Sequence, residues 1–568
     1  MNSVRSSRWL MRLIVLLSCA VLFAGWRALW FLTDDAFIAF RYVSNSVLGH
    51  GYVWNPPPFA PVEGYTSFLW VVLLDAIWRL TGIAPPEASN VVSLAFAIAS
   101  LLLTAHLAAN WPLGPTLSRH RLALTALLLG GIVTNRTFLT WTSSGLETQM
   151  SNFWGLAWLA SACAYSRNRT RSNGLRLSTF ATLLALTRPE GLLFAGATAV
   201  IVAVEWVGRR ETPGAVRNML WSLAPLLGIA AHLAWRRSFY GEWLPNTYYA
   251  KHVAPWPEAG AHYLLQFVLE HSLWFCAALS LAYLPSLIVR RWRELRAAAS
   301  SAGWLVGWIE RGLIRDLAVA ASVASVLYYT LVIGGDTFGF RIYSHLVPLI
   351  ALALLWLVDR VGMKPLSAIA VLAAHGLLAS PIAWTHYAVA RELPAQVKRQ
   401  DVAAQIAPDL PTGLRWYGEL YDRTSAWLKA RLLCGRHHGW EQMTRDQMRK
   451  YPARDDQQRM PEDDIPVLAL EAVGYAGWSL PYVAILDVHG LNDYVVARMP
   501  ARSGVERQMA HDRVASPEYL AEFEPNVRVH KSEPRVRYSA RANGPLTAER
   551  VREIERRWRE RVRAAPKQ

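Results

Sequence analysis

The chain has 568 residues, of which 53% are hydrophobic and only 18% are charged, and its formal net charge is +17. Soluble chains average roughly 25% charged residues, so this composition is typical of a protein embedded in a membrane. The basic residues stand in short loops between apolar runs, which is the positive-inside pattern of membrane proteins and argues against nucleic acid as a partner.

The apolar runs are long enough to cross a hydrocarbon core, and we expect about eleven or twelve membrane helices from them. They lie near residues 10–32, 66–83, 90–109, 121–140, 148–166, 177–206 (one span or two short ones), 219–237, 263–290, 316–334, 343–358 and 364–385. No comparable run follows Ala390. The sequence therefore predicts an all-α membrane bundle over residues 1–390 and a separate water-exposed domain over residues 391–568.

The first apolar run decides the topology. It follows three arginines, as in a signal peptide, but it continues past Cys19 to Trp30, which favours an uncleaved anchor with a cytoplasmic N-terminus. The loop 34–65 then lies outside. Strict alternation places TSSGLE (142–147) inside, whereas the flanking basic loops place it outside, so we expect one early segment to be re-entrant or horizontal. The basic interval 291–315 predicts an amphipathic segment on the cytoplasmic face.

The C-terminal region has a mixed pattern. Residues 415–433 read as an amphipathic helix. Residues 465–498 show short β-branched runs separated by Gly and Pro, which predicts an α/β fold. Beyond residue 530 the chain is charged and poor in apolar side chains, which predicts a helical or frayed tail.

Two adjacent carboxylates, Asp34 and Asp35, stand where the first apolar run ends. Neighbouring carboxylates repel, so the pKa of one should rise, and a carboxylate with such a pKa can accept a proton from a hydroxyl nucleophile. The alternative is an N-cap for a helix that starts at Ala36, although one Asp would suffice for a cap. We therefore interpret the pair as candidate catalytic residues.

The loop that follows contains further polar and aromatic residues. Arg41 and Tyr42 stand within helical reach of Asp34, and Arg41 either pairs with a carboxylate or steadies the base. The run GHGYVWNPPP is rich in turn residues. Glu63 and Tyr65 follow it, and Glu63 is either a surface carboxylate or a hydroxyl-binding group.

Polar clusters also interrupt later apolar runs. Glu147 ends SSGLE, and Arg188 and Glu190 flank a helix-breaking proline in LTRPEG. An arginine beside a glutamate at membrane depth should be paired, either as a structural ion pair or along a substrate path.

Two further clusters combine cations with aromatic residues. YGEWLPNTYYAKH and GGDTFGFR together supply Asn246, Tyr248, Tyr249, Lys251, Asp336 and Arg341. Arginine and lysine at this depth suit a phosphate headgroup, and simple snorkelling is the alternative for Lys251 and Arg341. A base, cations for a phosphate and aromatic walls are what an enzyme needs to transfer a sugar from a lipid phosphate.

In this order, the clusters resemble those of the GT-C superfamily of polytopic glycosyltransferases, and more narrowly the group that contains actinobacterial cell-wall arabinofuranosyltransferases of the terminal β-(1→2) type. The matching segments are DDAFIAFRYVSNSVLGHGYVWNP (34–56), PVEGYTSFLW (61–70), SSGLET (143–148), LALTRPEGLLF (184–194), YGEWLPNTYYAK (240–251), GGDTFGFR (334–341) and LDVHGLNDYVVAR (486–498). They cover most of the chain.

The resemblance implies a polytopic GT-C bundle in a bacterial inner membrane, with its catalytic loop and an α/β C-terminal domain on the extracytoplasmic side. It implies a polyprenyl-phosphate sugar donor, an inverting reaction and a glycan or protein acceptor. Asp34 or Asp35 is then the general base. Arg188, Lys251 and Arg341 bind the donor phosphate. The remaining substrate-binding residues are Arg41, Tyr42, Glu63, Tyr65, Glu147, Glu190, Asn246, Tyr248, Tyr249 and Asp336.

The sequence leaves the metal requirement and several alternative functions open. Some superfamily members need a divalent cation such as Mg²⁺ or Mn²⁺; neither the four cysteines nor any ligand cluster predicts a metal site here. A transporter or flippase of lipid-linked sugars would need inverted repeats and broken helices, and no repeat is evident. An enzyme of the same fold that transfers mannose or another sugar to protein or lipid A, and a non-catalytic assembly factor, are further alternatives.

Overall fold

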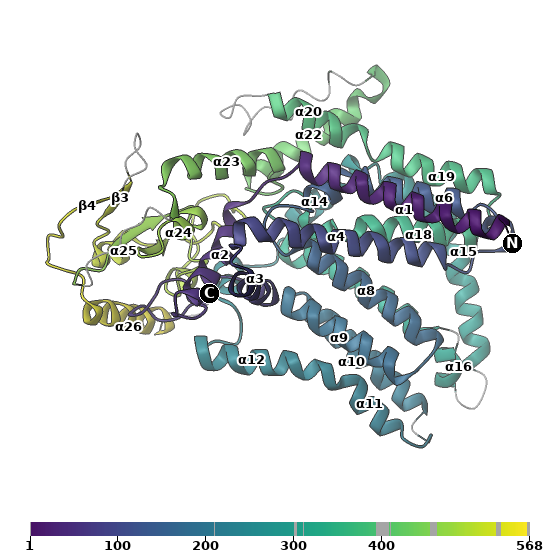
Figure 1. Cartoon of the computed structure of the whole chain (residues 1–568), viewed down its shortest axis with the longest axis horizontal. Coiled ribbons are helices and arrows are strands. Elements are labelled where there is room, and N and C mark those ends of the chain that lie inside the picture. The colour runs from purple at the N-terminus through teal and green to yellow at the C-terminus, as the bar shows by residue number, and fades with distance from the viewer. Residues whose placement is uncertain are drawn as a thin grey trace.

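The computed structural model describes residues 2–209, 211–299, 304–310, 312–392, 408, 411–454, 463–529 and 536–564. Most of the first 392 residues form a helical bundle, and its principal helices run along the long axis of the molecule (Figure 1). Within this bundle α4 packs against α8, α8 against α9, and α9 against α10.

The bounds of the bundle helices are α1 (Asn2–Ala28), α2 (Asp34–Val47), α3 (Phe68–Thr81), α4 (Pro85–Ala109), α5 (Pro115–Ser118), α6 (Arg121–Val133), α7 (Arg136–Thr140), α8 (Thr148–Arg167), α9 (Arg171–Thr187), α10 (Gly191–Arg209), α11 (Ala215–Leu223), η1 (Ala224–Leu226), α12 (Leu227–Tyr240), α13 (Asn246–Lys251), α14 (Pro257–Glu270), α15 (Trp274–Ala299), α16 (Trp304–Glu310), α17 (Leu313–Tyr328), η2 (Tyr329–Ile333), η3 (Arg341–Tyr343), α18 (Leu346–Arg360), α19 (Pro365–Leu378) and α20 (Pro381–Glu392).

Six helical segments of the described chain are long and apolar enough to cross a membrane, so the protein is a multi-pass membrane protein. They are Arg8–Ala28, Pro85–Ala109, Gly191–Gly208, Leu313–Ile333, Arg341–Arg360 and Pro365–Val389. A seventh is possible where α14 and α15 meet at an angle of 96°. The sequence predicted about eleven or twelve.

The difference has a physical cause, because apolar content in a sequence does not show where a helix breaks. The run 177–206 contains two helices, since Arg188 precedes a proline and adopts an extended backbone that ends α9. Other runs form helices that are too short, such as α3 and α12 with 14 residues each.

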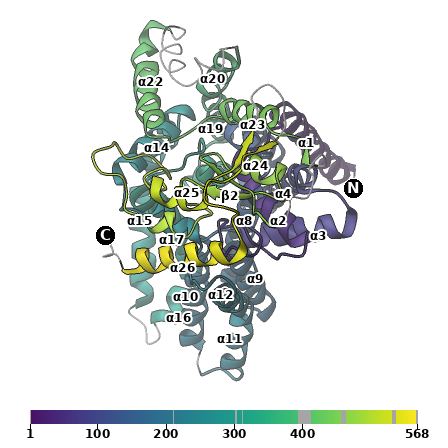
Figure 2. The same cartoon turned by 90° about the vertical axis from the view of Figure 1, so that its left-hand side faces the viewer.

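Most of the C-terminal segment, from α23 onward, gathers at one end of the bundle around α2, whereas α22 packs against α14 (Figures 1 and 2). Its elements are η6 (Thr412–Leu414), α22 (Arg415–Ala430), α23 (His437–Lys450), β1 (Val467–Leu470), α24 (Gly474–Ser479), β2 (Ala484–Asp487), η8 (Val496–Arg498), α25 (Pro517–Phe523), β3 (Val527–Val529), β4 (Val536–Tyr538) and α26 (Ala548–Ala564). Strands β1 and β2 pair in parallel, and β3 and β4 pair antiparallel. The predicted amphipathic helix, α/β region and helical tail are all present.

Aromatic residues join the two parts of the chain. Phe37 and Phe40 of α2 are buried against Tyr475 and Trp478 of α24, with ring centroids 5.1 and 6.2 Å apart. These residues belong to one apolar core that also contains Trp54. The C-terminal segment therefore shares a core with the first loop, although the division of the chain at residue 390 stays a prediction.

Candidate active site

Backbone pairing brings two predicted loops together. Leu32 forms a parallel bridge with Ser144, in which Ser144 donates its N–H to Phe31 O and Thr33 donates to Ser144 O, both at 3.0 Å. Gly145 has φ +77°, and a Cβ there would lie 2.6 Å from the side chain of Ala36, so only glycine fits. The acid pair at the start of α2 is thus fixed beside the loop that ends in Glu147.

Asn90 of α4 holds both loops, and the sequence analysis missed it. Its amide donates to Phe31 O at 2.9 Å, and its side-chain oxygen accepts from Gly145 N at 2.8 Å. The side chain is 1% exposed. A lone asparagine in an apolar run is the signal that could have identified it, because buried amides need partners.

The two aspartates have different surroundings. Thr33, rather than an aspartate, caps α2 by accepting the N–H of Ala36. Asp34 is buried, and its two oxygens accept the N–H groups of Gly474 (3.0 Å) and Tyr475 (2.8 Å) of α24. Burial raises the pKa of Asp34 to about 6; the Tyr475 amide opposes this rise and the charge of Asp35 adds to it.

Asp35 is half-buried, and its side chain forms no hydrogen bond or ion pair with any residue that the structure describes. Its carboxylate is therefore free to receive a proton. The Asp34 carboxylate is thus occupied by amide groups of the C-terminal segment, whereas the Asp35 carboxylate has no described partner.

Arg41 forms hydrogen bonds to both the first loop and the C-terminal segment. Its buried guanidinium donates to the carbonyl oxygens of Trp54 (2.7 Å), Gly477 (2.7 Å), Leu480 (3.2 Å) and Val483 (2.8 Å) and to Asn55 Oδ1 (3.1 Å). Burial lowers the pKa of Arg41 to about 9, which still leaves it charged at neutral pH. Among the described residues, Arg41 neither pairs with an acid nor forms a hydrogen bond with Asp34; it joins the first loop to the C-terminal segment.

Three other predicted site residues, Tyr42, Glu63 and Tyr65, also form hydrogen bonds or ion pairs within the protein. Tyr42 Oη donates to Val62 O at 2.8 Å and accepts Gly64 N–H at 2.7 Å. Glu63 pairs with Arg236 through both oxygens, at 2.6 and 3.1 Å. Tyr65 Oη lies 3.2 Å from Tyr240 Oη. These side chains are buried and shape the loop.

A second group of predicted residues meets around Arg188. Its Nη1 donates to Glu147 Oε1 at 2.7 Å, its Nε to Glu190, and its Nη2 to Tyr329 Oη at 2.9 Å. The predicted pairing of Arg188 with Glu190 is present, and Glu147 and Tyr329 complete it. Burial alone would raise the pKa of Glu190, but the Arg188 guanidinium lowers it below its usual range.

Arg341 lies on the wall of the same cavity as Arg188 and Glu190. Its Nε donates to Asp336 Oδ2 at 2.8 Å, and its guanidinium carbon lies 4.5 Å from the centre of the Phe338 ring. The cavity contains about 460 Å³ of empty space, including the part that is open to solvent. It is lined by Thr148, Ser151, Asn152, Gly155, Leu184, Arg188, Glu190, Phe194, Ser325, Tyr329, Arg341, Ile342 and His345.

Three of the candidate membrane spans contribute to this cavity, namely Gly191–Gly208, Leu313–Ile333 and Arg341–Arg360. His345 and Asn152 were missed, because neither stands in a motif that separates it from ordinary polar residues.

The predicted site residues of α13 point to different surroundings. The Asn246 amide donates to the carbonyl oxygens of Gly490, Leu491 and Asp493, at 2.8, 3.1 and 3.0 Å. Tyr249 is bound to Glu242 and covered by Arg498.

Tyr248 is exposed and stacks on His252, with ring centroids 5.2 Å apart. Lys251 is exposed and makes no ion pair with any described residue. Lys251 is not among the residues that line the cavity with Arg188 and Arg341.

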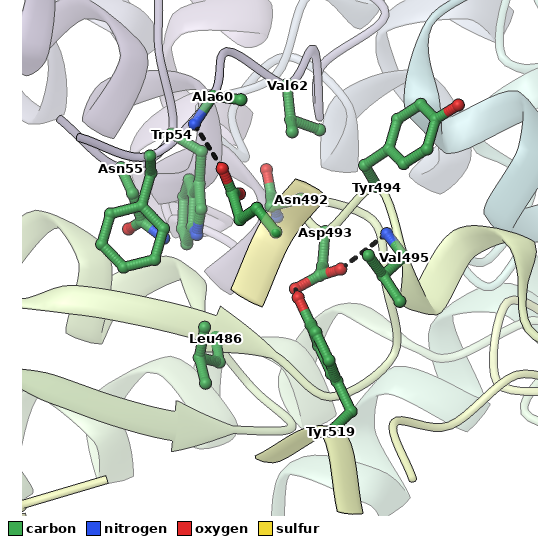
Figure 3. A pocket seen from close by; sticks show the side chains of 12 residues that line it. Trp54, Asn55, Ala60, Val62, Leu486, Asn492, Asp493, Tyr494, Val495 and Tyr519 are labelled. Atoms are coloured by element: carbon green, nitrogen blue, oxygen red, sulfur yellow. Dashed lines mark hydrogen bonds between the residues drawn. The ribbon is translucent and has the colours of Figure 1, made fainter. Parts of the chain in front are cut away.

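A second cavity, with about 360 Å³ of empty space including the part open to solvent, lies between the first loop and the C-terminal segment (Figure 3). Asp493 accepts the N–H groups of Val495 and Val496 and the hydroxyl of Tyr519, at 2.8, 3.0 and 2.9 Å. Glu555 accepts Ala60 N–H at 2.8 Å. The acids of this cavity are largely satisfied by the protein itself.

No group of three or more His, Cys, Asp or Glu side chains within the described ranges is placed to hold a metal ion. The arrangement offers a free carboxylate at the start of α2 and an arginine-containing cavity among apolar helices.

No protein-family model matches the chain, and no curated protein matches it. Among solved structures, ArnT from Cupriavidus metallidurans bound to undecaprenyl phosphate is 14% identical, with a TM-score of 0.42 over 83% of this chain and 85% of that one. The apo form of that protein matches with the same identity and TM-score over 87% of this chain and 88% of that one.

The Archaeoglobus fulgidus oligosaccharyltransferase in complex with Zn and sulfate is 12% identical, with a TM-score of 0.38 over 84% of this chain and 62% of that one. What the site of the present protein does follows from its own geometry.

Proposed function

We propose that the protein is an inverting glycosyltransferase of the GT-C type, which transfers a sugar from a polyprenyl phosphate to a glycan or protein acceptor on the extracytoplasmic side of a bacterial inner membrane. One observation carries the proposal. Asp35, whose carboxylate has no partner among the described residues, follows Leu32, and Leu32 pairs with Ser144 in the loop that ends in Glu147, the partner of Arg188 at the arginine-lined cavity.

In the proposed reaction, Asp35 accepts the proton of an acceptor hydroxyl while the hydroxyl oxygen attacks the anomeric carbon. The bond between that carbon and the phosphate oxygen breaks, and the bonding electrons leave with the polyprenyl phosphate. The transition state resembles an oxocarbenium ion, as in glycoside hydrolysis. Arg188 and Arg341 stabilise the charge that develops on the departing phosphate.

Arabinofuranose is the sugar that we propose, because the motif order resembles the arabinofuranosyltransferase group over most of the chain. Lys251 is exposed on α13 and stays a proposed contact of the donor phosphate. A divalent cation would neutralise part of the phosphate charge. Transfer measured with and without a chelator shows whether the enzyme needs one.

A transporter of lipid-linked sugars is the second candidate, favoured by the 96° break between α14 and α15. Reconstituted vesicles distinguish the two functions. A transporter moves the lipid-linked sugar across the bilayer without an acceptor, whereas an enzyme consumes the donor only when an acceptor is present.

A transfer assay tests the enzyme directly. The purified chain, an acceptor extract and synthetic polyprenyl-phosphate arabinofuranose should give a glycosylated product, and Asp35→Asn should reduce the rate by about 10²–10⁴-fold. Glu87→Gln is the matched control, because Glu87 is an exposed acid on α4. If the chain transfers sugars only from other lipid phosphates, arabinofuranose is not its donor sugar. If it transfers none of them, the proposed function is wrong.

A further inference from the structure

The charges around the cavity do not favour an anion in the state that the structure shows. Arg188 and Arg341 are the cations, and Glu147, Glu190 and Asp336 are bound to them. Two positive and three negative groups leave this cluster with a net charge of minus one. A phosphodiester that entered beside five such groups would add a second negative charge at low dielectric, which is unfavourable.

The two acids that hold Arg188 are not equivalent. Glu190 lines the cavity, whereas Glu147 is not among its lining residues. The Glu147 side chain is 5% exposed and that of Glu190 is 13% exposed. Arg188 and Glu190 both line the cavity, and the Glu190 carboxylate binds the guanidinium at Nε on that wall.

We propose that Glu190 is a displaceable counter-ion of Arg188, which leaves the guanidinium when the phosphate of the lipid donor takes its position. This inference rests on the proposed function and adds to it the residue that sets the selectivity of the phosphate site. Glu147 and Tyr329 keep Arg188 in place during the exchange through Nη1 and Nη2.

The exchange explains why a second acid lies beside Arg188. A buried charge without a partner is costly, so Glu190 stabilises Arg188 while the cavity is empty. A free inorganic phosphate gains only the contacts to the arginines and must displace Glu190. A polyprenyl phosphate gains in addition the burial of its chain among apolar helices. Glu190 thus selects anions that are attached to lipid.

Equilibrium binding of undecaprenyl phosphate to the full chain in detergent micelles tests the inference. Glu190→Gln removes the competing charge at nearly constant volume, so we expect affinity to rise about tenfold or more. Inorganic phosphate, which should not compete in the wild type at millimolar concentration, should compete in this variant. Glu190→Asp shortens the side chain by one methylene and should give an intermediate gain. Glu258→Gln, at an exposed acid of α14, is the matched control and should bind like the wild type.

Each outcome separates the inference from the function on which it rests. Tighter binding by Glu190→Gln, with new competition by inorganic phosphate, supports the exchange. If the wild type binds undecaprenyl phosphate and the folded variants bind it equally or more weakly, Glu190 is a structural partner only and the inference fails alone. If neither the wild type nor any variant binds it, the proposed function fails as well. Glu190→Asp supplies the readout if Glu190→Gln does not fold.

Discussion

At the scale of single residues, Asp34 and Asp35 are chemically identical neighbours that the fold makes different. The oxygens of Asp34 are occupied by two amides of α24, while Asp35 has no partner among the described residues. A sequence shows the pair but not which member is occupied, because the occupying amides are 440 and 441 positions away.

This difference predicts unequal effects of amide substitution. Asp35→Asn should lower kcat by about 10²–10⁴-fold with little change in thermal stability, because only the proton acceptor is lost. Asp34→Asn should lower stability by about 1–3 kcal/mol, because its NH₂ group faces a backbone N–H of α24. Kinetics and thermal unfolding of both variants check the assignment. Equal kinetic losses with unchanged stability would contradict it.

The pKa of Asp34 predicts a pH dependence of stability. The folded chain holds this proton up to about pH 6, whereas an unfolded chain releases it near pH 4. Between these values the folded state binds more protons, so the Asp34 contribution to the free energy of unfolding falls as pH rises, by roughly 3 kcal/mol at most. Thermal unfolding of wild type and Asp34→Asn from pH 4 to pH 7 should show this slope in the wild type only. Parallel profiles would show that Asp34 ionises normally.

At the scale of elements, the contact between α24 and α2 depends on a glycine. A Cβ at Gly474 would lie 1.8 Å from the backbone oxygen of Asp34, and backbone cannot yield as a side chain does. Gly474→Ala should therefore cost at least about 3 kcal/mol and separate α24 from Asp34. Gly439→Ala in α23 is the control, because nothing lies within 4 Å of its Cβ position. Thermal unfolding of both variants measures the difference; equal midpoints would mean that α24 shifts freely.

Local elements were predictable where one pattern determines them. The amphipathic helix after residue 415, the α/β pattern around β1 and β2, and the partnership of Arg188 with Glu190 all follow from nearby residues. The roles of Arg41 and Asn246 did not, since their partners come from the C-terminal segment. An arginine close to an aspartate indicates an ion pair, and only the fold shows that carbonyl oxygens bind it instead.

At the scale of the whole molecule, the C-terminal segment holds the first loop in place through hydrogen bonds. Trp54 donates to Ile485 O at 2.8 Å, and Asn55 accepts Ile485 N–H at 2.9 Å. Together with the amides on Asp34, these contacts mean that displacing the segment would remove the partners of one catalytic candidate and the ordering of the loop. The position of the C-terminal segment and the chemistry of the acid pair are therefore coupled.

Arg41 tests this coupling, because one guanidinium bonds four carbonyl oxygens and one amide oxygen across the junction. Arg41→Gln cannot reach these acceptors, and each buried carbonyl left without a donor costs about 1–3 kcal/mol. Arg41→Lys should fail similarly, since an ammonium group lacks the planar fork of the guanidinium. Hydrogen exchange should then show faster opening of residues 474–487, with transfer activity lost in the same variants. Arg79→Gln is the control, because the Arg79 side chain is half-exposed and, within the described part of the chain, is bound to Asp75 one helical turn away and to Ser46. Unchanged exchange in the Arg41 variants would mean that the aromatic core alone holds the C-terminal segment, and activity should then persist.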